Sequence, residues 1–591
     1  MDLFLSLLAF LSPLIFAASP DYCPLLGPIL PPPRALSTSS AFLAAKNNIS
    51  SALEAAIAGT SPLNDVFDPN TTSFAIQVFS TNDAEPLFES YYTAPNVNTS
   101  VGVNVVNEDT VFRIGSGSKI WTILLMLIER GDMVFRDPVA KYVPEIRRMS
   151  TNPPGNEIDS VRWKEVTIGQ LASHLAGVSR DYGFVDLATL LPDPSAIGLP
   201  ELSAAEFPPC GTPGRPCDRK RFFDGFLKRH PVVPTASTPV YSNAAFQILG
   251  YALEAMTGQS YQTLLSRDLI RPLNLTRSSY NKPADRLGVI PGDVETTWWT
   301  YSLGDETPTG GLYSSTKDVA TLGRAILDSR LLSSSLTRRW LKPASHTSSL
   351  GLAVGAPWEI YSFPSSRVVD LYAKAGDLGS YSSMLALSPD HKVGFTILIA
   401  GTNTHWTTAY LSDLLANSLL PALDEAAKEE AIPRFVGSYF ARNSSSSLTI
   451  TTDDGPGLKV ETWLNEGNDM FNTLSLLVGA SITDLSVRLY PTELKAPGRV
   501  SFRAVFRDLS LGVDGIGPFS RACATWFLVD AFVYGAVGLD EFVFDVDKQG
   551  KAVAVEARGV RMILKEGELA MTPHISILYL EEEAASPRVC R

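Results

Sequence analysis

Three short motifs in this chain hold residue types that together can carry out nucleophilic catalysis. Such catalysis needs a hydroxyl, a group that takes its proton and donors that hold an oxyanion. In the SGSK motif of residues 116–119, an apolar helix begins directly after a predicted strand. Residues i and i+3 of a helix share one face, so the Lys119 ammonium can lie beside the Ser116 hydroxyl, and the helix N-terminus adds free N–H groups. This position distinguishes it from the Ser-x-x-Lys of residues 314–317, which is interpreted as a helix N-cap.

The second and third motifs supply a base and a further cation. Tyr241 opens a Tyr-Ser-Asn motif that ends at Asn243, and a phenol near two ammonium groups has a lowered pKa and can act as a general base. Lys374 opens a Lys-Ala-Gly motif on a predicted strand, whereas residues 548–550 match the same pattern in a predicted turn. Because the three motifs follow one another in strand–helix, loop and strand contexts, together they indicate a serine active site.

The sequence resembles the serine β-lactamase and penicillin-binding-protein superfamily, in particular the class C β-lactamase-like esterases and peptidases. The resemblance covers about residues 40–425 and is carried by FRIGSGSK, TIGQLASHLAGV, PVYSNAAFQILGYALEAMTG, GGLYSSTKDVATLGRAIL and KAGDLGSYSSMLALSPD. From about residue 432 the chain resembles the extra β-rich domain of secreted fungal β-lactamase-like proteins. The resemblance implies an α/β sandwich, in which helices flank an antiparallel sheet beside an all-helical region, followed by a C-terminal all-β domain.

The resemblance also implies a role for each motif residue. Ser116 would be the nucleophile and Lys119 its proton-relay neighbour. Tyr241 would be the base for acylation and for activation of the deacylating water. Asn243 would hydrogen-bond the substrate and Lys119, and Lys374 would add positive potential.

The third motif bears on the substrate as well. The backbone N–H groups of Ser116 and Asp377 would form the oxyanion hole, and Gly376 would allow close approach of the strand. β-Lactamases often have Thr where this chain has Ala375, so a hydroxyl that would bind a substrate carboxylate is absent. Asp377 is expected to place a negative charge near the same point. Both differences disfavour an anionic β-lactam and are compatible with a neutral ester or amide.

These residues favour a secreted serine hydrolase that forms an acyl-enzyme at Ser116, most of all an esterase. Four alternatives stay open: a β-lactamase, a D-amino-acid peptidase, an acyltransferase of secondary metabolism and a non-catalytic binding protein. The expected partner is a small ester, amide or lactam; no cofactor is expected, and the oligomeric state stays open. His174 is interpreted as structural, and Trp298 and Trp299 as either pocket or core residues. The sequence has no G-x-S-x-G elbow, so it does not support a lipase-type triad.

Composition and charge exclude several other classes of protein. Of the 591 residues, 45% are hydrophobic and 19% are charged, which excludes a disordered chain, a collagen and a coiled coil. Lys and Arg number 49 against 62 Asp and Glu, so the net charge is −13, and the sequence has no long basic run. A nucleic-acid partner requires the opposite charge and is not expected.

The N-terminus and the glycosylation sequons indicate secretion. Residues 1–19 form a short apolar run that ends in small residues, typical of a signal peptide, so no membrane attachment is expected after its cleavage. Because this segment has Asp2 and no Lys or Arg, an N-terminal membrane anchor is the alternative. Five N-x-Ser/Thr sequons are candidate glycosylation sites: Asn48, Asn70, Asn98, Asn274 and Asn443.

The five cysteines fit an oxidising compartment. Cys210 and Cys217 bracket a loop rich in turn residues and are predicted to form a local disulfide. Cys23, Cys523 and Cys590 cannot all pair within the chain, so one free or processed thiol is expected. The sequence has no CxxC or HExxH motif and only six His, so a metal site of Cys or His ligands is not expected.

The elements around the motifs predict how the motifs come together. Strands are expected at residues 73–80 and 85–92, and three more follow one another within residues 367–401. Helices are expected from residue 118 to Gly131 and over most of residues 240–270. Strands at both ends of a segment with helices between them predict one sheet assembled from both ends of a domain.

A change of pattern near residue 432 predicts a second domain, an all-β sandwich or barrel. Its expected strands are residues 447–454, 457–466, 485–494, 500–506, 541–547 and 551–558. The apolar stretch from Ala524 is interpreted as two buried strands, because Asp and Gly residues interrupt it too often for a membrane span. The predicted organisation is a signal peptide at 1–19, a catalytic domain at 20–430 and a C-terminal β-rich domain at 431–591.

Overall fold

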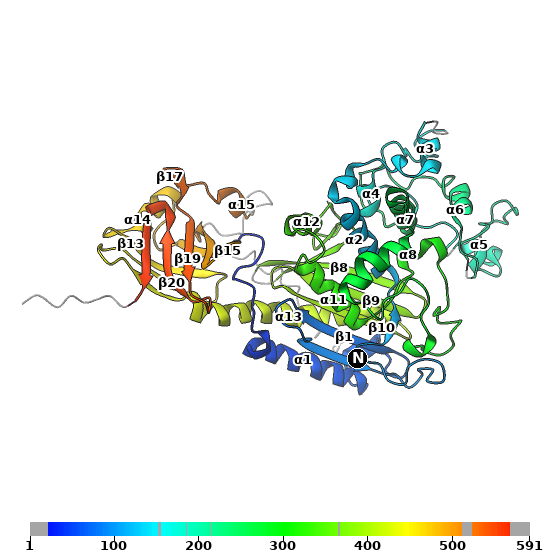
Figure 1. The fold of residues 1–591 in the computed structure, drawn as a ribbon, viewed down its shortest axis with the longest axis horizontal. Helices are drawn as coiled ribbons and strands as arrows, with labels where there is room; N and C mark the ends of the chain where they lie inside the picture. The colour runs from blue at the N-terminus through cyan, green and yellow to red at the C-terminus, as the bar shows by residue number, and fades with distance from the viewer. Residues whose placement is uncertain are drawn as a thin grey trace, which may run out of the picture. The chain divides into compact units, whose positions relative to one another are not determined.

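The chain divides into two compact units, Met1–Ala431 and Ile432–Arg591 (Figure 1). The computed structural model describes residues 22–151, 155–184, 186–212, 214–364, 367–510 and 523–567. The predicted signal peptide of residues 1–19 and Cys590 lie outside these described residues. Among the helices that are described, none is both long and apolar enough to cross a membrane.

An eight-stranded antiparallel sheet forms the centre of the first unit, in the order β2-β1-β10-β9-β8-β7-β6-β5. Strand β1 (Ser73–Ser80) pairs with β10 (Val393–Ala400), so the sheet is assembled from both ends of the unit, as predicted. The expected first hairpin and the three successive strands after residue 367 are also confirmed. The other strands are β2 Phe88–Tyr92, β5 Ser345–His346, β6 Leu352–Val354, β7 Glu359–Pro364, β8 Val368–Leu378 and β9 Tyr381–Ser388.

Helices cover both faces of this sheet, as Figure 1 shows. Helices α1 (Ser40–Ile57) and α13 (Thr404–Phe435) contribute to the apolar core on one face. Helices α2 (Ser118–Arg130) and α11 (Thr316–Leu327) contribute to the core on the other face. This arrangement is the predicted α/β sandwich.

A mainly helical region between β2 and β5 in the chain carries the first two motifs. It includes a small separate sheet in which β3 (Val111–Arg113) pairs with β4 (Tyr313–Ser315). Helix α7 (Asn243–Thr257) begins at the second motif, where the Ser242 hydroxyl accepts a hydrogen bond from the Ala245 N–H at 3.0 Å. The other helices are α3 Pro144–Thr151, α4 Ile168–Ala172, α5 Leu187–Leu190, α6 Arg219–Phe226, α8 Tyr261–Leu264, α9 Arg271–Leu273, α10 Thr307–Gly310 and α12 Ser334–Trp340.

The second unit is a closed antiparallel sheet, which agrees with the expectation of a C-terminal all-β region. Its order is β12-β11-β21-β20-β19-β16-β15-β13, and β13 pairs back with β12, so the ring of strands closes. Short strand β14 (Asn468–Asp469) and helix α14 (Met470–Val478) are additions that the sequence analysis did not predict. The ring strands are β11 Gly437–Phe440, β12 Ser447–Thr451, β13 Leu458–Asn465, β15 Leu485–Ala496, β16 Arg499–Asp508, β19 Glu541–Val546, β20 Ala552–Ala557 and β21 Met562–Glu566.

The stretch that begins at Ala524 differs from its predicted structure. It was expected to form two buried strands, but only its last part, β19, is a buried strand. The rest forms the short helix α15 (Thr525–Leu528) and a hairpin of β17 (Val533–Tyr534) with β18 (Val537–Gly538). The expectation was wrong because the backbone turns at positions with positive φ: Asp530 at 62°, Gly535 at 56° and Ala536 at 62°.

Candidate active site

Ser116 lies in a tight turn between a short strand and a long helix. After β3 (Val111–Arg113) the chain forms the 3₁₀ turn Gly115–Gly117 and then enters α2. Gly115 has a φ of 47°, and a Cβ atom there would lie 2.6 Å from the backbone nitrogen of Asp377, so the position requires glycine. The turn therefore holds Ser116 against the end of β8.

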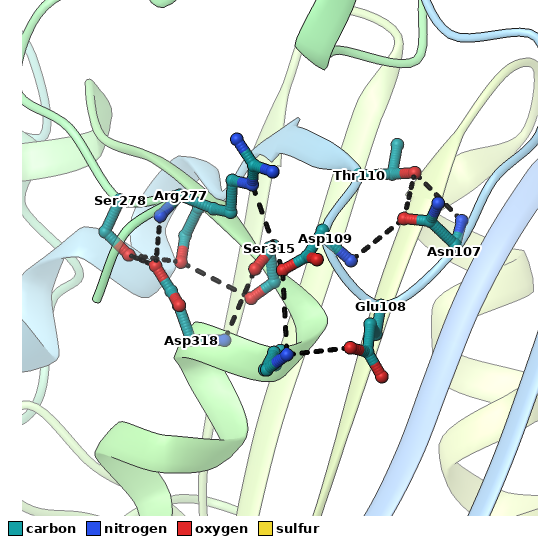
Figure 2. A network of polar contacts seen from close by, with 10 residues as sticks. Asn107, Glu108, Asp109, Thr110, Arg277, Ser278, Ser315 and Asp318 are labelled. Atoms are coloured by element: carbon teal, nitrogen blue, oxygen red, sulfur yellow. Dashed lines mark hydrogen bonds and ion pairs between the residues drawn. The ribbon is translucent and has the colours of Figure 1, made fainter. Parts of the chain in front are cut away.

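A polar network fixes the loop that precedes β3 (Figure 2). The Asp318 carboxylate accepts hydrogen bonds from the Arg277 backbone N–H at 2.8 Å and from the Ser278 hydroxyl at 2.8 Å. Lys317, one residue earlier on α11, forms an ion pair with Glu108 of the loop at 2.7 Å. The loop before β3, the strand that leads to the candidate nucleophile, is thus bonded to α11, which lies about 200 residues later in the chain.

The Ser116 hydroxyl lies between two groups that can carry a proton. The Tyr241 hydroxyl donates a hydrogen bond to Ser116 Oγ at 2.6 Å, across 125 positions of sequence, and Lys119 Nζ donates to the same oxygen at 2.9 Å. Lys119 Nζ also donates to Asn243 Oδ1 at 2.8 Å and to the Thr309 carbonyl oxygen at 2.9 Å. The structure thus brings the first two motifs together around one hydroxyl oxygen.

Lys119 sits in a buried chain of hydrogen bonds. Burial lowers the pKa of Lys119, the nearby Lys374 ammonium lowers it further, and Tyr241 opposes both. Asn243 accepts from Lys119 through Oδ1 and donates through Nδ2 to Asp181 Oδ1 at 2.8 Å. Burial raises the pKa of Asp181 against the effect of this hydrogen bond. A continuous chain therefore runs from the candidate nucleophile to Asp181.

Three cations surround the ring of Tyr241. Lys119 Nζ lies 4.9 Å and Lys374 Nζ lies 5.3 Å from the ring centroid, and the guanidinium carbon of Arg180 lies 4.8 Å from it. Burial raises the pKa of Tyr241, but the two ammonium groups outweigh that effect, so the pKa lies below the ordinary value for tyrosine. The phenol is therefore a stronger acid than usual, and its phenolate is available as a base at lower pH.

His174 holds the Tyr241 ring in place. The two rings stack with centroids 4.5 Å apart and planes at 26°. His174 also binds the residues on each side of Tyr241, because its carbonyl oxygen accepts from the Val240 N–H at 2.8 Å and its Nδ1 accepts from the Ser242 N–H at 3.1 Å. Burial, and then the three neighbouring cations, hold the pKa of His174 well below its ordinary value, so the ring is neutral and its proton is on Nε2.

Lys374 is paired with a carboxylate that no sequence motif includes. Lys374 Nζ forms an ion pair with Glu359 of β7 and donates to the Ala375 carbonyl oxygen at 2.8 Å. Glu359 also accepts the Ala375 N–H at 3.0 Å. Burial lowers the pKa of Lys374, but Glu359 and then Tyr241 outweigh it and raise that pKa above the ordinary value. Lys374 is therefore a permanent cation beside the candidate base.

The third motif brings the edge of β8 against Ser116. A Cβ atom on Gly376 would lie 2.7 Å from the Ser116 nitrogen, so this close approach requires glycine. The Ala375 N–H points toward Glu359, on the side of β8 away from β9. N–H groups two residues apart point to the same side of a strand, so the Asp377 N–H points off the same edge, where the turn with Ser116 lies.

The Asp377 side chain, by contrast, points away from the candidate catalytic residues. Alternate side chains of β8 face opposite sides of the sheet, so Lys374 lies on the α2 side whereas Ala375 packs against the core under α1 and α13. The Asp377 carboxylate accepts from the Ser382 hydroxyl at 2.6 Å and lies 3.1 Å from His405 Nδ1. The Asp377 carboxylate therefore lies on the same side of β8 as Ala375, and its effect on the substrate stays a prediction.

Sequence reasoning missed three carboxylates around the site, namely Asp181, Glu306 and Glu359. Burial raises the pKa of Glu306 to about 8, Asp181 adds to this effect and Lys119 opposes it, so Glu306 is mostly neutral at pH 7. None of the three belongs to a short motif. Their position depends on long-range packing, for which the local sequence has no signal.

The two tryptophans singled out in the sequence have different surroundings. Trp299 is completely buried and belongs to the core. Trp298 has a φ of 65° and packs with Phe184 and Tyr301, at ring-centroid distances of 5.9 and 4.9 Å. Arg113, at the end of β3, donates to the Trp298 carbonyl oxygen at 2.6 Å. Trp298 is therefore held beside the strand that leads to the site.

Comparison with known families agrees with this geometry. The family model described as Beta-lactamase matches residues 67–419, which include all three motifs. The model described as Beta-lactamase-like-like, C-terminal domain, matches residues 427–568. The chain belongs to the β-lactamase family, as the resemblance of its motifs predicted.

Relatives from fungi and bacteria share much of the chain. A Beta-lactamase-like protein of Arthroderma benhamiae is 30% identical over 584 residues, covering 91% of this chain and 95% of the relative. The Probable hydrolase M10 of Phoma sp. is 26% identical and covers 84% of this chain and 85% of the relative. The D-alanyl-D-alanine-carboxypeptidase/endopeptidase AmpH of Escherichia coli is 24% identical and covers 56% of this chain and 80% of that protein.

Proposed function

We propose that the protein is a serine hydrolase that forms an acyl-enzyme at Ser116 and acts as an esterase on a small-molecule ester. One observation carries the proposal: Ser116 Oγ lies 2.6 Å from the Tyr241 hydroxyl and 2.9 Å from Lys119 Nζ. A nucleophile within hydrogen-bond reach of a base, with the base oriented by further groups, is the arrangement that covalent catalysis needs. Membership of the β-lactamase family and a relative named as a probable hydrolase support it.

Acylation begins when the Tyr241 phenolate takes the proton of Ser116. Lys119 and Lys374 stabilise this phenolate, which is the reason for its lowered pKa. Ser116 Oγ then forms a bond to the substrate carbonyl carbon, and the oxyanion accepts hydrogen bonds from the N–H groups of Ser116 and Asp377. The bond to the leaving alcohol breaks, Tyr241 gives its proton to that alcohol, and Ser116 keeps the acyl group.

Deacylation repeats these steps with water. Tyr241 takes a proton from the water, the hydroxide oxygen bonds to the acyl carbon, and the Ser116 oxygen leaves and recovers its proton from Tyr241. Lys119, held by Asn243 and the Thr309 carbonyl oxygen, keeps its ammonium at the Ser116 oxygen in both halves. An alcohol in place of water would give acyl transfer by the same steps.

We further propose that the protein is secreted after removal of a signal peptide at 1–19, and that it consists of a catalytic domain at 20–430 and a β-rich domain at 431–591. Disulfides support this, since they persist in oxidising compartments. Cys210 is bonded to Cys217, and Cys23 and Cys523 are also disulfide-bonded. Four sequon asparagines are exposed and accessible to glycosylation: Asn48, Asn70, Asn274 and Asn443.

The fifth sequon differs from these four. Asn98 is half-buried, and its Nδ2, the atom to which a glycan would be attached, donates to the Gly292 carbonyl oxygen at 3.0 Å. Attachment of a sugar at Asn98 would break this hydrogen bond. We therefore propose glycosylation at the four exposed positions only.

Turnover of p-nitrophenyl acetate, with Ser116→Ala measured in parallel, tests the proposed reaction. We expect Ser116→Ala to lower kcat by at least about a thousandfold. In the wild type, acid quenching during turnover should trap an acetyl group on Ser116, which intact-protein and peptide mass spectrometry detect. Equal slow turnover by both proteins would contradict the proposal, and an adduct at Ser116 that never turns over would favour the binding-protein alternative.

A further inference from the structure

A large cavity adjoins the residues proposed to be catalytic. Its volume is about 720 Å³, within the usual range for small-molecule sites. Two of its lining residues contact the site directly, because Asp181 accepts a hydrogen bond from Asn243 at 2.8 Å and Arg180 lies over the Tyr241 ring at 4.8 Å. The cavity lining therefore contacts Tyr241 directly and contacts Lys119 through Asn243.

A second contact joins the cavity to the end of β8. Phe184 lines the cavity and packs edge to face against Trp298, with ring centroids 5.9 Å apart. Phe184 and Trp298 belong to a small apolar cluster with Leu378, which directly follows Asp377, the proposed oxyanion donor. The cavity is thus connected both to the side of the proposed base and to the side of the oxyanion hole.

Four exposed apolar side chains lie on the wall of this cavity. Leu199, Leu202 and Phe207 line it and keep 37%, 38% and 43% of their surface exposed. Leu187, also in the lining, is 51% exposed. Large apolar side chains gathered on one concave surface, without partners that bury them, are typical of a ligand site.

Several charged residues of the lining already have partners within the protein. Asp181 pairs with Arg180 at 3.3 Å. Asp186 and Asp193 accept hydrogen bonds from backbone N–H groups, at 3.0 and 3.1 Å, at the starts of the short helices that follow them. The lining holds four carboxylates, Asp181, Asp186, Asp193 and Glu201, against the guanidinium groups of Arg180 and Arg229. An anionic ligand group would therefore meet an excess of negative charge, whereas a neutral apolar group would contact the leucine and phenylalanine side chains.

We propose that this cavity is the subsite for a large, uncharged, apolar group of the substrate, such as a fused aromatic ring or an alkyl chain. The group is carried on either the acyl or the alcohol side of the ester. This inference rests on the proposed function and deepens it, because it names bulky neutral esters as the substrate class instead of anionic or acetate-sized ones.

Two series of neutral esters test the inference by kinetics. One keeps p-nitrophenol and lengthens the acyl chain from acetyl to octanoyl; the other keeps acetate and changes the alcohol from phenol to 2-naphthol. We expect kcat/KM to rise at least tenfold along one series, since each buried methylene can contribute about fourfold. Leu199→Asp and Phe207→Asp should reduce that rise to less than about threefold. Ile197→Asp, at a position that is 65% exposed and outside the cavity lining, is the matched control and should keep it.

A binding measurement separates failure of this inference from failure of the proposed function. Calorimetric titration of the Ser116→Ala protein with 2-naphthol should show binding that Leu199→Asp weakens at least tenfold and Ile197→Asp leaves unchanged. That result would support the subsite even if the wild type turned over no ester, in which case only the proposed function would fail. Acetate turnover through Ser116 with flat rates in both series and no naphthol binding would overturn the inference alone.

Discussion

At the scale of single residues, the charges around Tyr241 determine how the proposed base works. Its phenolate must form before Ser116 can lose a proton, so kcat/KM should fall as the pH falls through the pKa of Tyr241. Lys119 and Lys374 lower this pKa and thus extend activity to lower pH. Glu359, paired with Lys374, partly offsets the field of that ammonium. The two members of this ion pair should therefore act in opposite directions on the pH profile.

Substitution of each member tests this argument. Lys374→Met removes a cation 5.3 Å from the Tyr241 ring, so the pKa of Tyr241 should rise and the acidic limb of kcat/KM should move up by about one pH unit or more. Glu359→Gln leaves the charge of Lys374 uncompensated, so the limb should move down. The measurement is kcat/KM for p-nitrophenyl acetate from pH 5 to 10. Shifts in the same direction for both variants would refute Tyr241 as the group that titrates.

His174 provides a second test at this scale, because it contacts Tyr241 and not the reacting atoms. His174→Phe keeps a ring for stacking but leaves the Ser242 N–H without its acceptor, and we expect kcat to fall roughly tenfold to a hundredfold. His174→Asn keeps an acceptor and tolerates the backbone φ of 61°, so it should recover part of the loss. The acidic limb of the pH profile should also move in the Phe variant. Loss of thermal stability alone, with an unchanged profile, would show that His174 is only structural.

The site residues that could be predicted are those that lie in a short motif at the start of a predicted helix or strand. Ser116 and Lys119 are three positions apart at the start of a helix, and Tyr241 precedes the cap of the next long helix, so their contexts are visible in the chain. Glu359 and Asp181 have no such context. Each reaches the site only through contacts with a distant strand or helix, which a single sequence does not reveal.

At the scale of elements, the network of Figure 2 fixes the strand that leads to Ser116. Asp318 is buried and accepts two hydrogen bonds at 2.8 Å. Asp318→Ala leaves the Arg277 N–H without this acceptor and the Ser278 hydroxyl with Ser314 as its remaining partner, so it should lower the free energy of unfolding of the first unit by about 2–3 kcal/mol. Glu108→Ala, the control, breaks only the exposed pair with Lys317 and should cost at most about 1 kcal/mol. Urea unfolding followed by tryptophan fluorescence measures both. Similar losses for the two variants would contradict this role of Asp318.

A helix or strand could be predicted where its own residues show the hydrophobic pattern of that element. Strands β8 to β10 are apolar runs separated by turn residues, and they lie where the pattern predicts. Strands β5 to β7 have only a weak strand pattern in their sequence. They form because β7 pairs with the edge of β8, β6 with β7 and β5 with β6, so the sequence alone did not predict them. Helix α1 was also missed, although Phe42, Ile49 and Leu53 on its buried face have helical spacing. The sequence of α1 therefore does carry a helical signal.

At the scale of the whole molecule, the boundary between the two units lies inside helix α13 (Thr404–Phe435). The change of sequence pattern near residue 432 correctly predicts where the second unit starts. It does not predict that one continuous helix runs across this boundary. Phe435, in the last turn of α13, is buried in the second unit, with ring centroids 5.3 Å from Phe502 and 5.2 Å from Phe544. The last residues of this helix therefore belong to the core of the closed sheet.

This boundary predicts how the chain tolerates truncation. All motif residues and the whole cavity lie within Met1–Ala431, so a chain that ends at Ala431 should hydrolyse p-nitrophenyl acetate with a kcat/KM within about threefold of the full-length value. A chain that ends at Phe435 carries an apolar ring without the aromatic partners that bury it, so it should aggregate more readily. Size-exclusion chromatography and ester turnover measure the two outcomes. A soluble chain ending at Ala431 without activity would show that the second unit contributes to the reaction itself.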